Sequence, residues 1–161
     1  MIIYVRPEKR DARYFDLISH LAAEPIRVWQ RIASAEGINA ELRPIRMHLP
    51  HELEVLQRAA TGGRRQGVLI TLGGLIPLDW HRLGIESVTP GEGFRERSSS
   101  LWMREWVHVR TIQPDGTGCT LHDHVELTPR LGWLAALLVP LYRTVFRRRH
   151  LQLRRQFGEL S

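Results

Sequence analysis

The last part of the chain carries one long apolar stripe at helical spacing. From Leu131 to Phe157, stripe residues recur every three or four positions. This spacing predicts a helix of about 27 residues, roughly 40 Å long at 1.5 Å per residue. The stripe consists of Leu131, Ala135, Leu138, Tyr142, Phe146, Arg149, Leu153 and Phe157. We expect this side of the helix to pack against a sheet.

The same segment contains six arginines and no acidic residue between positions 143 and 157. Only Arg149 falls on the stripe, and the other five are Arg143, Arg147, Arg148, Arg154 and Arg155. Charge runs on a helix are usually solvated faces, so we interpret these five as the exposed side. The alternative is weak, salt-dependent contact with an anionic membrane or nucleic acid. We expect no insertion into lipid, because the apolar side of the helix is committed to the sheet.

The composition fits a single domain over residues 1–161, with residues 1–12 as an N-terminal extension. Hydrophobic residues make up 43% and charged residues 25% of the chain, as in ordinary globular proteins. The net charge of +6 matches the six C-terminal arginines, so the basicity is local and argues against a specific nucleic-acid-binding surface. Cys119 is the single cysteine, which excludes an internal disulfide and favours a reducing compartment. The apolar run at 131–142 is too short for a membrane span of about 20 residues. We therefore expect a soluble, cytoplasmic, bacterial protein.

The first half of the chain predicts a strand followed by two short helices. Residues 13–23 mix aromatic and aliphatic side chains, as strands do. Pro25 then opens an amphipathic helix, which Gly37 ends in a left-handed cap. Asn39 caps a second helix over 39–43, which Pro44 stops. Further predicted elements are a strand at 45–49, a helix at 51–60 and a loop at 61–67.

The middle of the chain reads as five strands separated by turn signals. Turns are predicted at Pro77, at Pro90-Gly91, at 101–103 and at Asp115-Gly116. The strands between them cover 68–77, 79–88, 93–100, 104–113 and 118–127. Consecutive strands with short turns predict an antiparallel meander.

This order of elements resembles the START-like superfamily that includes the polyketide cyclases (SRPBCC). The local sequences that carry the resemblance are "EPIRVWQRIAS", "WVHV", "TLHDHVELTP" and "VFRRRHLQL", within residues 13–157. The resemblance implies the α+β helix-grip fold, a curved antiparallel sheet of about six or seven strands around the C-terminal helix. It also implies a cavity between sheet and helix for a lipid-, sterol- or polyketide-like ligand. "GINAELRP" and "GFRERSSS" suggest a narrower, uncharacterised subfamily.

The hairpin at Asp115-Gly116 sets which residues of the last two strands face the helix. A two- or four-residue loop places Trp106 opposite Val125, His108 opposite Asp123 and Arg110 opposite Leu121. Since Leu121 and Val125 should face inward, Trp106, His108, Arg110 and Asp123 should do so too. A loop of three or five residues would reverse that result for the first of the two strands.

The inward polar residues are the candidates for chemistry. A carboxylate on an apolar face needs a partner, and Asp123 has two candidates, His108 and Arg149. We favour a structural ion pair of Asp123 with Arg149, which locks the helix to the sheet. For His108, a structural role and a role as acid or base are equally open.

The leading functional hypothesis is binding of a small apolar ligand, and the alternative is a cyclase- or dehydratase-type enzyme. In the enzyme hypothesis His108 is the acid/base and Asp123 or Arg110 orients it. The predicted ligand-binding residues are Trp106, His108, Arg110, Asp123, Leu134, Leu138, Tyr142 and Arg149. Further candidates for the core or the cavity wall are Val68, Ile70, Leu72, Leu83, Ile85 and Phe94.

No other motif in the sequence supports a specific chemistry. His122 and His124 share a strand face that we expect to be exposed, but a metal site needs three or four converging ligands. Ser98–Ser100 lack a nucleophile-elbow context, and Cys119 lacks an activating base. "GGRRQG" lacks the lysine and the hydroxyl residue of a phosphate-binding loop. We therefore expect no metal and no cofactor.

Overall fold

A strand, two short helices, a series of strands and one long helix follow one another along the chain. The computed structural model describes residues 12–49 and 65–160. The strands are β1 (Arg13–Leu21), β2 (Ile45–Met47), β3 (Gln66–Leu72), β4 (Ile76–Leu83), β5 (Ile85–Thr89), β6 (Gly93–Ser100), β7 (Met103–Asp115) and β8 (Gly118–Pro129). The helices are α1 (Pro25–Ile32), α2 (Ala35–Leu42), the 3-10 helix η1 (Gly132–Leu134) and α4 (Ala135–Phe157).

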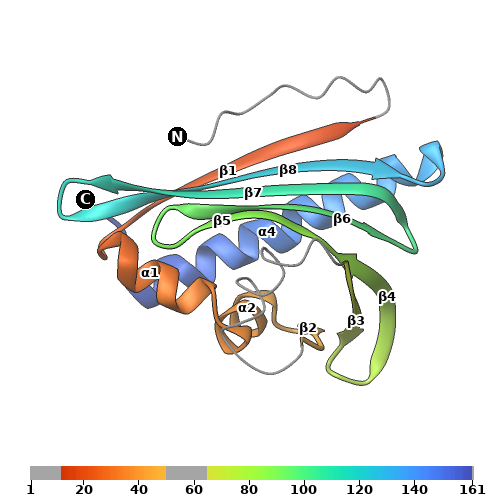
Figure 1. Cartoon of the computed structure of the whole chain (residues 1–161), viewed down its shortest axis with the longest axis horizontal. Coiled ribbons are helices and arrows are strands. Elements are labelled where there is room, and N and C mark those ends of the chain that lie inside the picture. The colour runs from red at the N-terminus through yellow and green to blue at the C-terminus, as the bar shows by residue number, and fades with distance from the viewer. Residues whose placement is uncertain (1–11, 50–64, 161) are drawn as a thin grey trace.

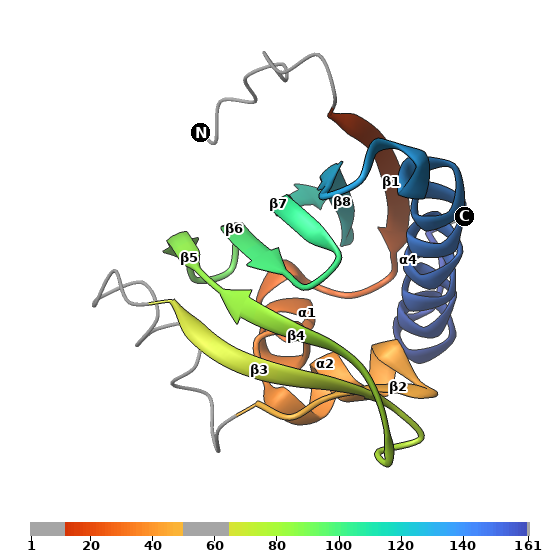
Figure 2. The ribbon, with the colours of Figure 1, turned by 90° about the vertical axis from the view of Figure 1, so that its right-hand side faces the viewer.

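The strands form one antiparallel sheet that curls around α4 (Figure 1). Their order is β1-β8-β7-β6-β4-β3-β2, and β5 pairs with β6 beside this path. Figure 2 shows the curl: the sheet starts beside α4 at β1 and returns toward α4 at β2. The predicted helix-grip architecture is therefore confirmed.

The local helix boundaries differ from the sequence prediction. Pro25 does open α1, but Gly37 lies inside α2 and ends no helix. The cap of α2 is Ser34, whose hydroxyl accepts a hydrogen bond from the Gly37 amide at 2.9 Å. Asn39 instead fixes β2, because its side chain bonds both the amide and the carbonyl of Met47. The predicted helix at 51–60 and most of the loop at 61–67 lie outside the described residues.

The meander also has turns in other places than predicted. The β3–β4 turn lies at Gly73 and Gly74, which have φ values of 62° and 82°, whereas Pro77 lies within β4 opposite Thr71. The predicted strand at 79–88 is divided at Gly84, where the chain bends. On either side of this bend, β4 pairs with the end of β6 and β5 with its beginning. At the C-terminus, η1 precedes α4. The α-helix therefore starts at Ala135, four residues after Leu131, where the predicted apolar stripe begins.

Two separate apolar clusters fill the space between the sheet and the helices. The cavity-side cluster consists of Phe15, Met103, Trp106, Val125, Leu127, Leu134, Leu138 and Phe146. The α1-side cluster contains Leu21, Val28, Trp29, Ile32, Ile112, Leu121 and Leu153, among others. On β7, Trp106 belongs to one cluster and Ile112 to the other, with His108 and Arg110 between them. The same change from one cluster to the other occurs along β1 at Ser19, along β8 at Asp123 and along α4 at Arg149-His150. A buried polar layer therefore crosses the core at one level.

Candidate functional site

The polar layer is positioned by the β7–β8 hairpin, whose register differs by two residues from the predicted one. Asp115 pairs with Gly118, so the two-residue loop is Gly116-Thr117, and Gly116 has the positive φ, 57°, that such a turn needs. Arg110 lies opposite Asp123, and His108 lies opposite Val125. The predicted pairs of His108 with Asp123 and of Arg110 with Leu121 are therefore wrong. The inward face was predicted correctly, because a shift of two residues preserves the side on which each residue points.

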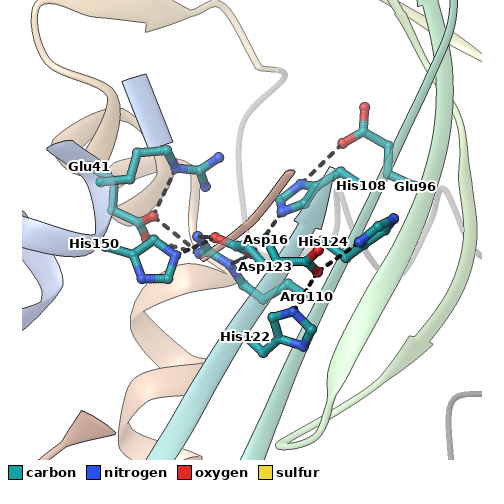
Figure 3. Close-up of polar contacts among 10 residues, drawn as sticks. Asp16, Glu41, Glu96, His108, Arg110, His122, Asp123, His124 and His150 are labelled. Carbon is teal, nitrogen blue, oxygen red and sulfur yellow. Dashed lines mark hydrogen bonds and ion pairs between the residues drawn. The ribbon is translucent and has the colours of Figure 1, made fainter. Parts of the chain in front are cut away.

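Asp123 is the centre of the polar layer and has no solvent exposure (Figure 3). Arg110 donates two parallel hydrogen bonds to it, from Nε to Oδ1 at 2.7 Å and from Nη2 to Oδ2 at 2.6 Å. His108 Nε2 lies 2.8 Å from Oδ1, and His150 Nε2 lies 3.0 Å from Oδ2. Burial raises the pKa of Asp123, but Arg110 and His108 outweigh it and hold that pKa well below its usual range. Asp123 is therefore a buried, fully bonded carboxylate.

Arg149 has a different partner from the one predicted for it. Its Nε donates to Glu41 Oε2 on α2 at 3.1 Å, and Arg110 Nη1 donates to the same oxygen at 3.1 Å. The predicted ion pair of Arg149 with Asp123 is therefore wrong, since Arg110 occupies that carboxylate. Glu41 holds both arginines and so ties α2 to α4 and β7. Burial and the neighbouring Arg110 lower the pKa of Arg149, against the opposite effect of Glu41.

A second buried carboxylate, Glu96 on β6, lies between two histidines. Its Oε1 is 2.8 Å from His81 Nε2 and accepts a hydrogen bond from the Ser98 hydroxyl at 2.6 Å. Its Oε2 is 3.7 Å from His108 Nδ1, an ion-pair distance (Figure 3). Burial raises the pKa of Glu96, but the contacts with His108 and His81 lower it by more. The pKa of Glu96 therefore lies below its usual range. Glu96 thus connects the polar layer to the next strand, β4.

The carboxylates of this assembly outnumber its guanidinium groups. Glu41, Glu96 and Asp123 are three carboxylates, and Arg110 and Arg149 are two guanidinium groups. Three imidazoles, of His81, His108 and His150, are further partners of the carboxylates. Buried charge is stable only when it is compensated, so these contacts contribute to holding the layer together. Two of these imidazoles, His81 and His108, also line the cavity described next.

A cavity of about 510 Å³ lies between the curled sheet and the first half of α4. This volume is in the range of small-molecule pockets. Its walls are mostly aliphatic and aromatic side chains from β2, β3, β4, β7 and α4. The polar residues in its lining are Asp79, His81, Glu96, Ser100, His108, Tyr142 and Arg149. Burial raises the pKa of Tyr142, so its hydroxyl stays protonated and can donate a hydrogen bond. The cavity therefore combines an apolar wall with a small number of polar groups.

Most of the predicted ligand-binding residues come together at this cavity. Its lining includes Trp106, His108, Leu134, Leu138, Tyr142 and Arg149. Arg110 and Asp123 are not in the lining and lie behind His108, so contact of these two with a ligand stays a prediction. Of the further candidates, Ile70 and Leu72 also line this cavity. Leu83, Ile85 and Phe94 line a smaller pocket of about 60 Å³ on the far side of Glu96 and His108, and Val68 belongs to the α1-side cluster.

Several residues of the site were not singled out in the sequence. Glu41, His81, Glu96 and His150 all have buried side chains with charged partners. His81 and Glu96 stand on strands whose alternation would have placed them inward, had the bend at Gly84 been foreseen. Asp79 also lines the cavity; its Oδ1 accepts a hydrogen bond from the Leu101 amide at 3.0 Å. Its Oδ2 is buried with no hydrogen-bond partner among the described residues. Glu41 had no sequence signal, since its partners come from segments about 70 and 110 residues later.

The two histidines on the outer face of β8 share one carboxylate. Asp16 Oδ1 lies 2.8 Å from both His122 Nε2 and His124 Nδ1. His124 is buried, against the expectation that this face is exposed, and Tyr14 packs beside it. Within residues 12–49 and 65–160, no group of three or more His, Cys, Asp or Glu side chains is placed to hold a metal ion.

Two further sequence expectations can be compared with the described part of the chain. Cys119 is buried, and burial together with Asp115 raises its pKa, which disfavours the thiolate. None of the helices described is both long and apolar enough to cross a membrane.

Solved structures place this architecture among the helix-grip proteins. Protein CV1439 from Chromobacterium violaceum has a TM-score of 0.68 at 15% identity, over 92% of this chain and 99% of its own. The ZhuI aromatase/cyclase from Streptomyces sp. R1128 has a TM-score of 0.67 at 11% identity, over 88% of this chain and 91% of its own. Ara h 8.0201 has a TM-score of 0.58 at 8% identity, over 88% of this chain and 97% of its own. At these identities the likeness concerns the fold alone.

The sequence itself defines a narrower family. The chain belongs to the family described as a domain of unknown function, DUF8410, whose model matches residues 19–157. None of the curated proteins is significantly similar to it in sequence.

Proposed function

We propose that this protein binds a small, predominantly apolar molecule in the cavity between the sheet and α4. The observation that carries the proposal is the cavity itself: about 510 Å³, with an aliphatic and aromatic wall and a few polar groups in its lining. Such a wall contributes affinity through buried apolar area, and a few polar groups fix the orientation of the ligand. Helix-grip neighbours include the ZhuI aromatase/cyclase, which supports a ligand of aromatic or polyketide-like character.

The test is to fill the cavity from α4 without changing the rest of the protein. Val145 lines the cavity, whereas Leu151 lies on the same helix outside it. The fluorescence of N-phenyl-1-naphthylamine, a neutral apolar probe, should rise with wild-type protein and with Leu151→Phe. Val145→Phe should weaken that binding by about tenfold or more, because the added ring occupies the space of the probe. Native mass spectrometry of gently purified wild-type protein should then identify a resident ligand.

Either of two results would refute binding in the cavity. One is a wild-type protein that leaves the probe fluorescence unchanged. The other is a Val145→Phe variant that is folded and binds the probe as tightly as the wild type does.

A second candidate function, acid/base conversion of the bound molecule, is favoured by the pair of His81 and His108. Both line the cavity, and the ionised Glu96 between them orients the two rings and can stabilise the positive charge of a ring that takes a proton from the bound molecule. His108 is 3% exposed and faces the cavity rather than bulk water, as the proposed role requires. Asp123 behind His108 orients its ring and stabilises the imidazolium form.

Proton transfer can be tested without knowing the natural substrate. In deuterated water, wild-type protein should accelerate exchange of the methyl protons of 2-acetonaphthone, followed by NMR. His81→Gln or His108→Gln should slow the exchange by about 100-fold or more, within the range for loss of one general base. If wild-type protein binds the ketone without accelerating the exchange of its methyl protons, the acid/base function is excluded for that class of ketone. The binding function would still stand.

A further inference from the structure

The end of the molecule at which the cavity opens carries an unusual number of exposed apolar side chains. Leu75 is 88% exposed, Trp133 71% and Leu101 63%. Together with their neighbours they form what we term the rim: Leu72, Leu75, Ile76, Leu78, Leu101, Trp102, Leu131, Trp133, Leu137 and Leu141. They come from the β3–β4 turn, the β6–β7 turn and the segment from η1 into α4. Isolated exposed leucines are normal, but a contiguous set of this size marks an interaction surface.

Half of the rim residues lie at the mouth of the cavity. Leu72, Leu78, Trp102, Leu137 and Leu141 belong to the rim and also line the cavity. The Trp102 indole donates to the Leu78 carbonyl at 2.9 Å, which joins the β6–β7 turn to β4. The Arg130 amide donates to the Trp102 carbonyl at 3.0 Å, which joins that turn to the segment leading into α4. Figure 2 looks at this end of the molecule, with β3 and β4 below and the start of α4 at the right.

The exposed charged side chains within the segments that carry the rim belong to arginines. The sequence has no acidic residue in 72–78, in 101–104 or between Glu126 and Glu159. Exposed arginines accompany the rim: Arg46 packs against Gly74 of the β3–β4 turn, and Arg104 follows the β6–β7 turn. Arg130 is also exposed, and its Nε donates to the Ser100 carbonyl at 3.0 Å. The surface therefore presents tryptophan, leucine and arginine without an exposed carboxylate in its own segments.

We propose that the rim docks this protein on an anionic lipid bilayer, with the mouth of the cavity facing the membrane. Leucine side chains enter the acyl boundary, tryptophan rings lie at the interface, and arginines contact anionic headgroups. A second copy of the chain fits this surface less well, because a two-fold contact would set arginine against arginine. The surface also differs from the C-terminal arginines considered in the sequence. The expectation that α4 has no free apolar side is wrong for its first half, where Leu137 and Leu141 are exposed.

Sedimentation with vesicles tests the proposal independently of any cavity ligand. Full-length protein should pellet with vesicles of phosphatidylcholine containing phosphatidylglycerol, and far less with phosphatidylcholine alone. Raising the salt from about 0.1 M to about 0.5 M should weaken binding without abolishing it, since apolar insertion is not screened. The double variant Leu75→Ser/Trp133→Ser should lose affinity by about tenfold or more. Its matched control, Tyr14→Ser/Ile18→Ser, changes two similarly exposed apolar residues on the outer face of β1 and should bind like wild type.

A second pair of variants tests the charge. Arg46→Gln, Arg104→Gln and Arg130→Gln combined should weaken binding to anionic vesicles several-fold. The control is the triple variant Arg147→Gln/Arg148→Gln/Arg155→Gln, which changes exposed arginines of α4 that lie outside the rim. This variant should keep most of the binding to anionic vesicles.

The following outcomes would overturn the proposal. One is that wild-type protein fails to pellet with either vesicle type. Another is that both apolar double variants lose binding equally, or that only the α4 arginine variant loses it. A dimer of the wild type in light scattering that becomes a monomer in Leu75→Ser/Trp133→Ser, without vesicle binding, would assign the rim to a second copy.

Discussion

Asp123 is a buried carboxylate with partners on two neighbouring elements. Within the described part of the chain these partners are Arg110, His108 and His150, which come from β7 and α4. Breaking one member of a buried ionic network leaves the others uncompensated in a medium of low dielectric constant. The cost of losing Asp123 therefore falls on Arg110, which would lose both of its short hydrogen bonds to that carboxylate.

We predict that Asp123→Asn lowers the free energy of unfolding by about 3–5 kcal/mol. Urea denaturation followed by circular dichroism measures this difference. Asp115→Asn is the control, because Asp115 is exposed in the β7–β8 turn and its loss should change stability little. Equal stabilities of the two variants would show that the polar layer does not hold the fold.

The sequence located these residues better than it located their partners. Helical spacing identified Arg149 as the one buried arginine of its segment, and strand alternation placed Asp123 inward. Periodicity specifies a face, but not the height at which two elements meet. The partner of Arg149 therefore could not be deduced, since Glu41 reaches it from α2, over 100 residues earlier in the chain.

Among the elements, the bend between β4 and β5 decides which residues of this region face the cavity. The Arg97 amide donates to the Gly84 carbonyl at 2.8 Å, and the Gly84 amide donates to the Ser98 hydroxyl at 3.0 Å. A Cβ atom at Gly84 would lie 2.6 Å from the Arg97 carbonyl oxygen. Glycine is therefore required here by the close approach of two backbones.

Gly84→Ala should lower the free energy of unfolding by about 1–3 kcal/mol, as overpacking does. Chemical denaturation of Gly84→Ala and Gly132→Ala provides the comparison. A Cβ atom at Gly132 in η1 meets no other atom within 4 Å, so that variant should resemble wild type. Stability of Gly84→Ala equal to that of Gly132→Ala would mean that the bend accommodates a side chain.

At this scale the sequence predicted the order of the strands and helices but not their joints, and it treated the strands on either side of Gly84 as one. Pro77 and Gly37 looked like boundaries and lie inside β4 and α2. Proline is tolerated in a strand where its missing amide costs no ladder bond, and a helix accepts glycine at modest cost. Where a strand or helix ends therefore depends on residues that are close in space but distant in sequence, and a local sequence pattern does not contain them.

For the whole molecule, the buried carboxylates determine how stability depends on pH. The pKa values of Glu96 and Asp123 are lowered in the folded protein, as is that of Asp16 on the outer face. A carboxylate with a lowered pKa adds stability above its unfolded pKa, and this stability is lost as the pH falls. The loss should therefore begin near pH 4, where unfolded carboxylates take up protons.

We predict a nearly constant contribution of these carboxylates between about pH 7 and pH 5 and a steep loss below about pH 4. Denaturant midpoints measured across this range give the profile. Glu96→Gln should flatten the acid limb, because one of the protons is no longer taken up on unfolding. Glu24→Gln, a change at an exposed carboxylate, should reproduce the wild-type slope. An acid limb of the same slope in both variants would contradict the role of Glu96.

The helix-grip architecture was expected from the resemblance of the element order to the START-like superfamily, and local signals agreed with that order along most of the chain. A long amphipathic helix after a meander also needs a sheet against which to bury its apolar side. The resemblance also implied a cavity, but the sequence could not show whether it is open or filled, since the side chains that line a cavity are of the same types as those that fill a core. Only the packing of the strands and helices against one another decides whether such residues line a cavity or fill a core.

The division of the core by a polar layer has a consequence for protein engineering. Substitutions that reshape the cavity would be made at lining residues such as Leu134, Leu138 and Val145. These residues do not belong to the α1-side cluster. Mutations far apart and without shared partners usually act additively, so the α1-side cluster can keep the chain folded while the cavity is redesigned. Libraries that vary the wall and leave Glu41, Arg110, Asp123 and Arg149 unchanged should therefore yield a high share of folded variants with altered ligand preference.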